Sequence, residues 1–289
     1  MRFQLLALNI DGTLLQKNGT LSRATREAIA YAQEKDVYVT LVTNRNFPSA
    51  QKVAKTLKIP DSLLITHSGA FIARDIDEPY LQRRISENDT YQIVQALEFY
   101  ACNVRILHER FSYANRKKLD VSEIANEIFS KGDPVFYPIQ FFDSLTDQLR
   151  DEPVVAPKID VYFDDKEELE QAMGVIQNTF DRVDTIRVSE QKFEVVPKGV
   201  SKLWGLVQLG RLLHIPLSQM VYVGDGWDDR APIETVGCGV SMWNAPKEIQ
   251  AVSDWVTRSN EQNGVAYMVR EVFRKQQRAD FLSQYTNKS

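Results

Sequence analysis

One stretch near the start of the chain decides the fold: Phe3-Gln4-Leu5-Leu6-Ala7-Leu8-Asn9-Ile10-Asp11-Gly12-Thr13-Leu14. Residues 3–8 are an apolar run of strand length, as expected for a strand that is buried on both faces of a sheet. Polar side chains and a glycine follow at once, which predicts a turn where the strand ends. In an open α/β sheet, ligands bind outside the carboxyl ends of the strands, so this turn is a candidate site.

The sequence on either side repeats the same alternation of apolar runs and amphipathic stretches. Ser22 is a predicted N-cap, and the order strand–helix–strand–helix–strand is half of a doubly wound parallel sheet. The predicted segments are strands at residues 3–8, 37–43 and 63–66 and helices at 23–34 and 48–57. The pattern returns late in the chain, with helices at 201–213, 230–235 and 264–274 and strands at 220–223 and 239–242.

The middle of the chain has mixed apolar spacing, which predicts an inserted α+β domain. Its expected strands are residues 103–108, 110–113, 158–163 and 184–188, and its expected helices are 87–100, 121–129 and 166–179. We therefore predict a core domain of residues 1–82 and 189–289 around an insertion of residues 83–188. Residues 276–289 are polar and are expected to form a frayed tail.

The composition excludes several classes of protein. The 289 residues contain 35 Lys and Arg and 39 Asp and Glu, a formal net charge of −4. This leaves no cationic surplus to bind nucleic acid through its phosphates, and no apolar run reaches the roughly 18 residues of a membrane span. Cys102 and Cys238 are too few for a disulfide scaffold and are expected to be buried free thiols in the cytoplasm.

Polar side chains follow several of the predicted core strands. The first strand is followed by Asn9 and Asp11, the second ends in Thr43-Asn44-Arg45, and a later one runs into Gly224-Asp225-Gly226-Trp227-Asp228-Asp229. Lys202 lies at a predicted helix start. The carboxyl ends of parallel strands share one edge of a sheet, so we expect these groups to meet there.

Carboxylates that meet at one edge repel each other unless a cation lies between them. Four are expected here: Asp11, Asp225, Asp228 and Asp229. Mg²⁺ is the cation that suits carboxylates, water and a substrate phosphate best. The sequence therefore predicts a magnesium site that can accept the phosphate of a substrate.

These segments, in this order and with this insertion, resemble the haloacid dehalogenase (HAD) superfamily, and most closely its Cof-type sugar-phosphatase branch. The resemblance covers essentially the whole chain, including Gly237-Cys238-Gly239-Val240-Ser241-Met242 and Asn263-Gly264-Val265-Ala266. It implies a Rossmann-like α/β core with a parallel sheet, an inserted α+β cap of type C2, and phosphohydrolase activity on small metabolites such as sugar phosphates.

The resemblance also implies a role for each matching residue. The family's first motif reads Asp-x-Asp-Gly-Thr, and its leading Asp is the nucleophile that forms an aspartyl-phosphate. Asp11 matches the second Asp, the general acid/base, whose carbonyl binds Mg²⁺. Thr43 matches the hydroxyl that contacts the phosphoryl group, and Lys202 the lysine that steadies its charge. Asp225 matches the direct Mg²⁺ ligand, and Asp229 the carboxylate behind it.

Three positions depart from the family pattern. Asn9 stands where the nucleophilic Asp is expected, Asn44 replaces a glycine, and Asp228 replaces an asparagine. A carboxamide cannot form a stable acyl-phosphate, so two-step hydrolysis should be severely impaired. We expect Mg²⁺ to bind still, with Asn9 as a neutral oxygen ligand, and Gly12, Asn44 and Arg45 to contact the substrate.

Three interpretations of Asn9 stay open. The chain is a slow phosphatase in which water attacks directly or Asp228 assists, or it is an inactive protein that binds or senses a phosphorylated metabolite. In the third, Asn9 is an engineered substrate-trapping change. Oligomeric state has no signal in the sequence.

Simpler roles compete for some of these residues. Asp228 and Asp229 could cap the following helix, and Arg45 could form a structural salt bridge. In the insertion, Arg105, His108, Arg110 and residues 116–118 form a basic stretch that is either a solvated face or a surface that meets a phosphorylated substrate. His67 ends a predicted strand and is either structural or part of the pocket.

Overall fold

The structure is a computed structural model that describes residues 2–116 and 137–274. It divides into two compact units. Unit 1 comprises Met1–Thr43, Gln51–Leu64 and Leu206–Ser289, and unit 2 comprises Asn44–Ala50 and Ile65–Gly205. The helix predicted at residues 121–129 and the polar tail at 276–289 lie outside the described residues. Among the described helices, none has the length and apolarity needed to cross a membrane.

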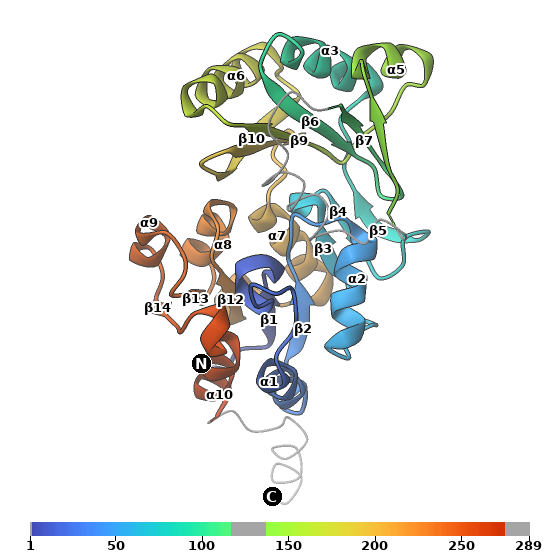
Figure 1. The fold of residues 1–289 in the computed structure, drawn as a ribbon. Coiled ribbons are helices and arrows are strands. Elements are labelled where there is room, and N and C mark those ends of the chain that lie inside the picture. The colour runs from blue at the N-terminus through green and yellow to red at the C-terminus, as the bar shows by residue number, and fades with distance from the viewer. Residues whose placement is uncertain (1, 117–136, 275–289) are drawn as a thin grey trace, which may run out of the picture. The chain divides into compact units, whose positions relative to one another are not determined.

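Unit 1 contains a five-stranded sheet in the order β14-β13-β12-β1-β2 (Figure 1). All of its strand pairs are parallel, which confirms the predicted α/β class. The strands are β1 (Leu5–Leu8), β2 (Tyr38–Leu41), β12 (Met220–Gly224), β13 (Cys238–Ser241) and β14 (Trp255–Val256). The helices that begin and end in this unit are α1 (Arg23–Gln33), α8 (Arg230–Thr235), α9 (Lys247–Ala251) and α10 (Gly264–Phe273).

Local sequence explains these elements. All four residues of β1 are fully buried, as expected for a strand covered on both faces. Helix α1 starts where the hydroxyl of Ser22 accepts a hydrogen bond from the Thr25 backbone N–H at 3.0 Å, which confirms the predicted N-cap. Both cysteines are thiols outside any disulfide; Cys102 is buried as expected, but Cys238 is only half-buried.

The third predicted strand forms but does not join the parallel sheet. β3 (Leu64–Thr66) belongs to a three-stranded sheet with β4 (Phe71–Ala73) and β5 (Pro79–Gln82). Side chains of β2 bind the backbone just before β3 instead. The Tyr38 hydroxyl accepts from the Leu63 N–H at 2.8 Å, and Thr40 Oγ1 donates to the Leu63 carbonyl at 2.6 Å. These contacts satisfy groups that a strand ladder would otherwise pair.

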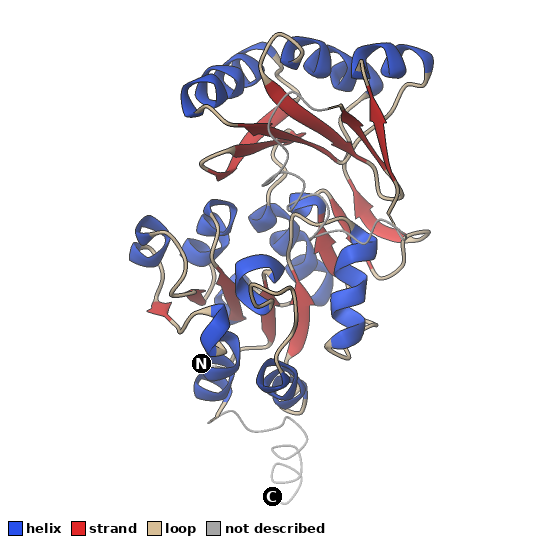
Figure 2. Ribbon diagram, in the orientation of Figure 1, coloured by secondary structure: helices blue, strands red, loops and turns tan. Residues whose placement is uncertain are grey.

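Unit 2 contains a six-stranded mixed sheet in the order β10-β11-β9-β6-β7-β8. The strands are β6 (Cys102–Leu107), β7 (Ser112–Asn115), β8 (Ile139–Phe142), β9 (Lys158–Phe163), β10 (Val183–Ser189) and β11 (Lys192–Pro197). Helices α3 (Glu87–Leu97), α5 (Leu145–Asp151) and α6 (Lys166–Thr179) lie along one face of this sheet (Figure 2). Two helices, α2 (Phe47–Thr56) and α7 (Lys202–Leu213), have residues in both units.

The two faces of the mixed sheet differ in chemistry. Ile159, Val161 and Phe163 of β9 join an apolar cluster with residues of α3, α5 and α6. The alternating residues of β9 point to the other face and include Lys158 and Asp160, which are also buried. β11 pairs antiparallel with β9 and β10, although the sequence prediction groups residues 189–289 with the core. The domain boundaries at 82/83 and 188/189 stay predictions.

Candidate active site

Three neighbouring strands of unit 1 end at the same edge of the parallel sheet. Leu8 of β1 pairs with Leu41 of β2 and with Val223 of β12. Asn9, Thr43 and Asp225 follow these strands within two residues of the last pair. The Asn9 backbone N–H also donates to the Val223 carbonyl at 2.9 Å, so the chain enters the turn in a fixed orientation.

The carboxamide of Asn9 lies at the centre of this edge. Its Nδ2 is 3.0 Å from the Asp11 carbonyl oxygen, 3.2 Å from Asp225 Oδ1 and 3.3 Å from Asp229 Oδ2. The residue is 5% exposed, and its Oδ1 is buried without a hydrogen-bond partner among residues 2–116 and 137–274. Asn9 thus supplies donors to three oxygens and leaves its own acceptor unused.

Asp229 holds the loop that follows β12. Its Oδ2 accepts from the backbone N–H groups of Asp225 and Gly226, both at 2.9 Å, and its Oδ1 accepts from the Tyr222 hydroxyl at 2.6 Å. Burial, with the nearby Asp229 charge, raises the pKa of Tyr222, so the phenol keeps the proton that it donates. Asp229 makes no N-cap hydrogen bond to α8, so its carboxylate orients the site loop instead.

The turn after β1 can contain only a glycine at position 12. Gly12 has a φ of 69°, and a Cβ there would lie 1.9 Å from Asp225 Oδ2. Thr13 Oγ1 donates to Asp225 Oδ1 at 2.7 Å, and Asn244 donates to the Gly12 carbonyl at 2.8 Å. The turn and the Asp225 carboxylate therefore fix each other.

Sequence reasoning missed three residues that contact the site: Thr13, Tyr222 and Asn244. Thr13 lies inside the first motif, so its hydroxyl was available as a signal. Tyr222 reads as one more buried strand residue, and Asn244 as a loop residue after β13, because their partners are several residues away or on another segment.

Of the four carboxylates that the sequence analysis groups together, Asp225 and Asp229 both contact the Asn9 amide. Within the described parts of the chain, no three His, Cys, Asp or Glu side chains are arranged to hold a metal ion. Asp11 and Asp228 are half-buried, whereas Asp229 is fully buried and its two oxygens are engaged by the loop and Tyr222. The oxygens that do converge are those of the Asp225 side chain, the Asp11 carbonyl and Asp229, all around the Asn9 amide.

The remaining predicted site residues belong to unit 2, except for Thr43, which is buried at the end of unit 1's first segment. Lys202 is the first residue of α7 and is 2% exposed. Asn44 and Arg45 are half-buried in the loop before α2; the Arg45 guanidinium donates to Ser49 Oγ at 3.2 Å. The Arg45 carbonyl accepts from the His67 N–H at 2.9 Å, which ties this loop to the end of β3.

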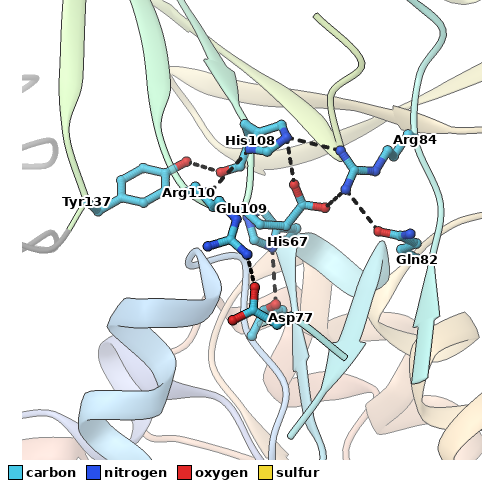
Figure 3. Close-up of polar contacts among 9 residues, drawn as sticks. His67, Asp77, Gln82, Arg84, His108, Glu109, Arg110 and Tyr137 are labelled. Carbon is cyan, nitrogen blue, oxygen red and sulfur yellow. Dashed lines mark hydrogen bonds and ion pairs between the residues drawn. The ribbon is translucent and has the colours of Figure 1, made fainter. Parts of the chain in front are cut away.

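Part of the basic stretch forms a balanced network in unit 2 (Figure 3). Glu109 lies between Arg84 and His108, with 3.2 Å from its Oε2 to His108 Nε2. His108 Nδ1 accepts from the Arg110 N–H at 3.3 Å, and His108 Nε2 lies 3.2 Å from the Arg84 guanidinium as well as from Glu109. The Arg110 side chain pairs with Asp77. Arg84 and Arg110 therefore have carboxylate partners already, whereas residues 117 and 118 lie outside the described residues.

Comparisons with known proteins show the family to which the chain belongs. The haloacid dehalogenase-like hydrolase family matches residues 6–269. The chain is 50% identical over 285 residues to Stress response protein YhaX of Bacillus subtilis (strain 168), covering 99% of this chain and 98% of that protein. It is 25% identical to Phosphatase YwpJ of the same organism, over 93% of this chain and 99% of that protein. The solved structure of the HAD subclass IIB sugar phosphatase BT4131 has the same fold, with a TM-score of 0.76 and 18% identity over 93% of this chain and 98% of that one. The chain therefore belongs to the haloacid dehalogenase-like hydrolases, the family that its sequence motifs predicted.

Proposed function

We propose that the chain is a Mg²⁺-dependent phosphohydrolase of small phosphorylated metabolites, sugar phosphates among them, and that Asn9 limits its turnover. Family membership and the relatives named as phosphatases support the reaction class. The observation that carries the proposal is the convergence of Asn9, Asp225 and the Asp11 carbonyl at the carboxyl edge of the sheet. The core and cap boundaries and a cytoplasmic location belong to the same proposal.

The donor set fits Mg²⁺ in type. Asp225 offers a carboxylate, Asp11 a backbone carbonyl, and Asn9 a buried carboxamide oxygen that lacks a partner among the described residues. These are hard oxygen ligands of the kind that Mg²⁺ prefers. Asn9 would have to present Oδ1 rather than Nδ2 to that position, a rotation of its terminal amide. Asp229 would support the ion through the loop, and Asp228 would add charge nearby.

The chain's own residues would then bind and orient the phosphate. Bound Mg²⁺ would neutralise charge on the phosphoryl oxygens. The Thr43 hydroxyl would donate to a phosphoryl oxygen, and the Lys202 ammonium would balance its charge. Asp11 would give a proton to the leaving oxygen and take one from water. Asn9 cannot attack phosphorus to give a stable acyl-phosphate, so hydrolysis would depend on direct attack by water.

A second candidate function is phosphometabolite binding without turnover. The Asn9 amide favours it, because its N–H groups bind the oxygens that a cation would otherwise neutralise. A neutral donor keeps the site assembled without supplying a nucleophile. The substrate-trapping interpretation predicts the same behaviour as this one.

Turnover of p-nitrophenyl phosphate separates these functions. We expect slow Mg²⁺-dependent release of p-nitrophenol by the wild-type chain and a rise of at least ~100-fold in kcat for Asn9→Asp, the scale of gain from a restored catalytic group. Asn18→Asp, an exposed Asn outside the site, makes the same charge change and should leave the rate unchanged. Activity that appears only in N9D would support the binding function. Inactivity of both chains with Mg²⁺ would contradict the phosphohydrolase proposal.

Thermal unfolding tests the metal site without measuring turnover. Asn9→Asp replaces a donor with a carboxylate that faces Asp225 and Asp229, so its midpoint without Mg²⁺ should fall below that of the wild type. Mg²⁺ should raise the midpoint of N9D more than that of the wild type, because the ion relieves the added repulsion. Equal shifts in N9D and N18D would contradict Asn9 as a ligand position.

A further inference from the structure

The helix-free face of the mixed sheet in unit 2 buries a closed ring of opposite charges. Lys158 Nζ lies 2.9 Å from Asp160 Oδ1 and 2.6 Å from Glu194 Oε1. Lys192 Nζ lies 3.0 Å from Asp160 Oδ2 and 3.3 Å from Glu194 Oε1. We call these four residues the lysine–carboxylate ring. Every side chain in it is at most 6% exposed.

The ring satisfies its own charge. Burial opposes ionisation of Asp160, but the charges of Lys158 and Lys192 hold the pKa of its carboxyl below the usual value. The hydroxyl of Tyr162 donates to Asp160 Oδ2 at 3.2 Å, and the hydroxyl of Ser68 donates to Glu194 Oε2. Two positive and two negative charges alternate, so the ring has no charge left to bind another ion.

Arg105 adds a fifth charge to this face. It lies on β6 directly opposite Asp160 of β9, and it is 7% exposed. Its Nε donates to Ser112 Oγ at 3.0 Å, and its Cζ lies 5.6 Å from the centre of the Tyr137 ring. These two contacts hold the guanidinium in one orientation. Its Nη2 is buried and has no hydrogen-bond partner within the described residues.

The two acids near Arg105 have other cationic partners: Asp160, whose pKa the Arg105 charge also lowers, is held by Lys158 and Lys192, and Glu109 by Arg84. Glu109 is paired with Arg84 and His108 in the network of Figure 3. A guanidinium stays protonated at all ordinary pH values, so it cannot become neutral to relieve its burial. The face therefore keeps one positive charge beyond those of the ring, together with an oriented N–H group that is unused in the described structure. A buried N–H group without an acceptor destabilises the fold, and a ligand that accepts its hydrogen bond would remove that cost.

His67 supplies a second unused polar atom beside the ring. Its Nε2 is buried with no hydrogen-bond partner in the described ranges of the chain, and Nδ1 lies 3.1 Å from Thr66 Oγ1. Lys158 and Asp160 both act electrostatically on its ring. His67 and Ser68 have φ values of 50° and 59°, which few non-glycine residues adopt. Strain of this kind is retained where a fixed side-chain position is needed.

We propose that Arg105 and His67 mark a binding site in unit 2 for the anionic group of a small organic molecule, a carboxylate or a phosphate. Its oxygens accept from Arg105 Nη2, and the anion balances the charge that the ring leaves over. His67 Nε2 binds a neighbouring polar group of the same ligand. The site is independent of Asn9 and of Mg²⁺, so it does not rest on phosphohydrolase activity.

Calorimetric titration without Mg²⁺ tests the site with simple probes. We expect succinate or orthophosphate to bind the wild-type chain, and succinamide, the neutral analogue of succinate, not to bind. The two anions tell a carboxylate site from a phosphate site. Arg105→Gln should raise the dissociation constant of the anion at least ~10-fold, since a charge-assisted hydrogen bond is lost. Arg105→Lys keeps the positive charge but loses the planar pair of guanidinium donors, so it should raise the dissociation constant less.

Arg110→Gln is the matched control, because it removes an arginine of the same segment whose partner is the exposed Asp77. Its affinity for the anion should equal that of the wild type. The proposal is overturned if neither anion binds the wild type, if succinamide binds as well as succinate, or if R105Q and R110Q have the same affinity. If R105Q does not fold, the thermal midpoint of the wild type in succinate against succinamide decides: an equal midpoint contradicts the site.

Discussion

The two units stabilise buried carboxylates in opposite ways. In unit 1, Asp229 is held by two backbone N–H groups, a phenol and the Asn9 carboxamide, all neutral donors. In unit 2, Asp160 and Glu194 are held by Lys158 and Lys192. Neutral donors orient a carboxylate without themselves cancelling its charge, whereas the two lysines of unit 2 both orient and neutralise the carboxylates that they contact. What remains in unit 2 is the positive charge of Arg105.

The largest expected effect is the loss of one lysine from the ring. Lys158→Met removes a cation that contacts both buried carboxylates, which leaves them with only part of their compensation. Breaking a buried pair in this way costs about 3–5 kcal/mol of unfolding free energy, measured by urea denaturation. Lys166→Met is the matched control, since Lys166 and its partner Glu190 are both largely exposed, and it should change stability little. Equal losses of unfolding free energy in the two variants would show that the buried lysine contributes no more than an exposed one, and unit 2 would not depend on charge to stabilise its carboxylates.

An intermediate effect is expected from acid. Burial, reinforced by the charge of Lys158, lowers the pKa of His67 from 6.5 to about 3, against the opposing charge of Asp160. Above pH 6.5 His67 is neutral in both states, and its contribution to stability is fully present. As the pH falls from 6.5 towards 3, His67 binds a proton in the unfolded chain but stays neutral in the folded chain, so the free energy of unfolding falls.

The slope from this one group approaches about 1.4 kcal/mol per pH unit. His67→Asn keeps a side chain that tolerates the left-handed backbone but removes the titration. Unfolding free energies of both chains, compared between pH 6 and pH 4, should show a shallower slope for H67N. Identical slopes would contradict a buried neutral His67.

The smallest effects compare helix caps in the two units. Ser22 caps α1 of unit 1, and Ser86 caps α3 of unit 2 by accepting from the Asp89 N–H at 3.1 Å. Each Ser→Ala change should cost about 1 kcal/mol. If the units unfold separately, S22A and S86A will shift different transitions in calorimetry; if the chain unfolds as one, both will shift the same transition. If the unfolding free energy falls by much less than about 1 kcal/mol in both variants, the two serines do not stabilise their helices as N-caps.

The sequence predicted the core elements because their signals are local. The apolar run at residues 3–8 contains β1, and the predicted helices at 166–179 and 230–235 coincide with α6 and α8. The turn after β1 was also predictable, because Gly12 follows a strand and lies beside acidic residues. Each of these signals is contained within one stretch of sequence.

Other features depend on partners far away in the chain. β4 has only three residues, and β5 is short and partly exposed, so neither carries a periodic signal; both were missed. Arg105 reads as one member of a basic surface stretch, yet the register of β6 against β9 buries it opposite Asp160, 55 positions later. Asp229 looks like a cap for α8, but it turns back to the loop because Tyr222 and two N–H groups meet it there.

The lysine–carboxylate ring also has a consequence for how β9 and β11 align during folding. Alternate residues of a strand face opposite sides, so a slip of β9 by one position would carry Lys158 and Asp160 into the apolar layer beneath the helices. A slip by two positions would keep the faces but bring Lys158 or Tyr162 opposite Glu194 in place of Asp160. The ring closes completely in one alignment, so it penalises any misaligned pairing of β9 with β11.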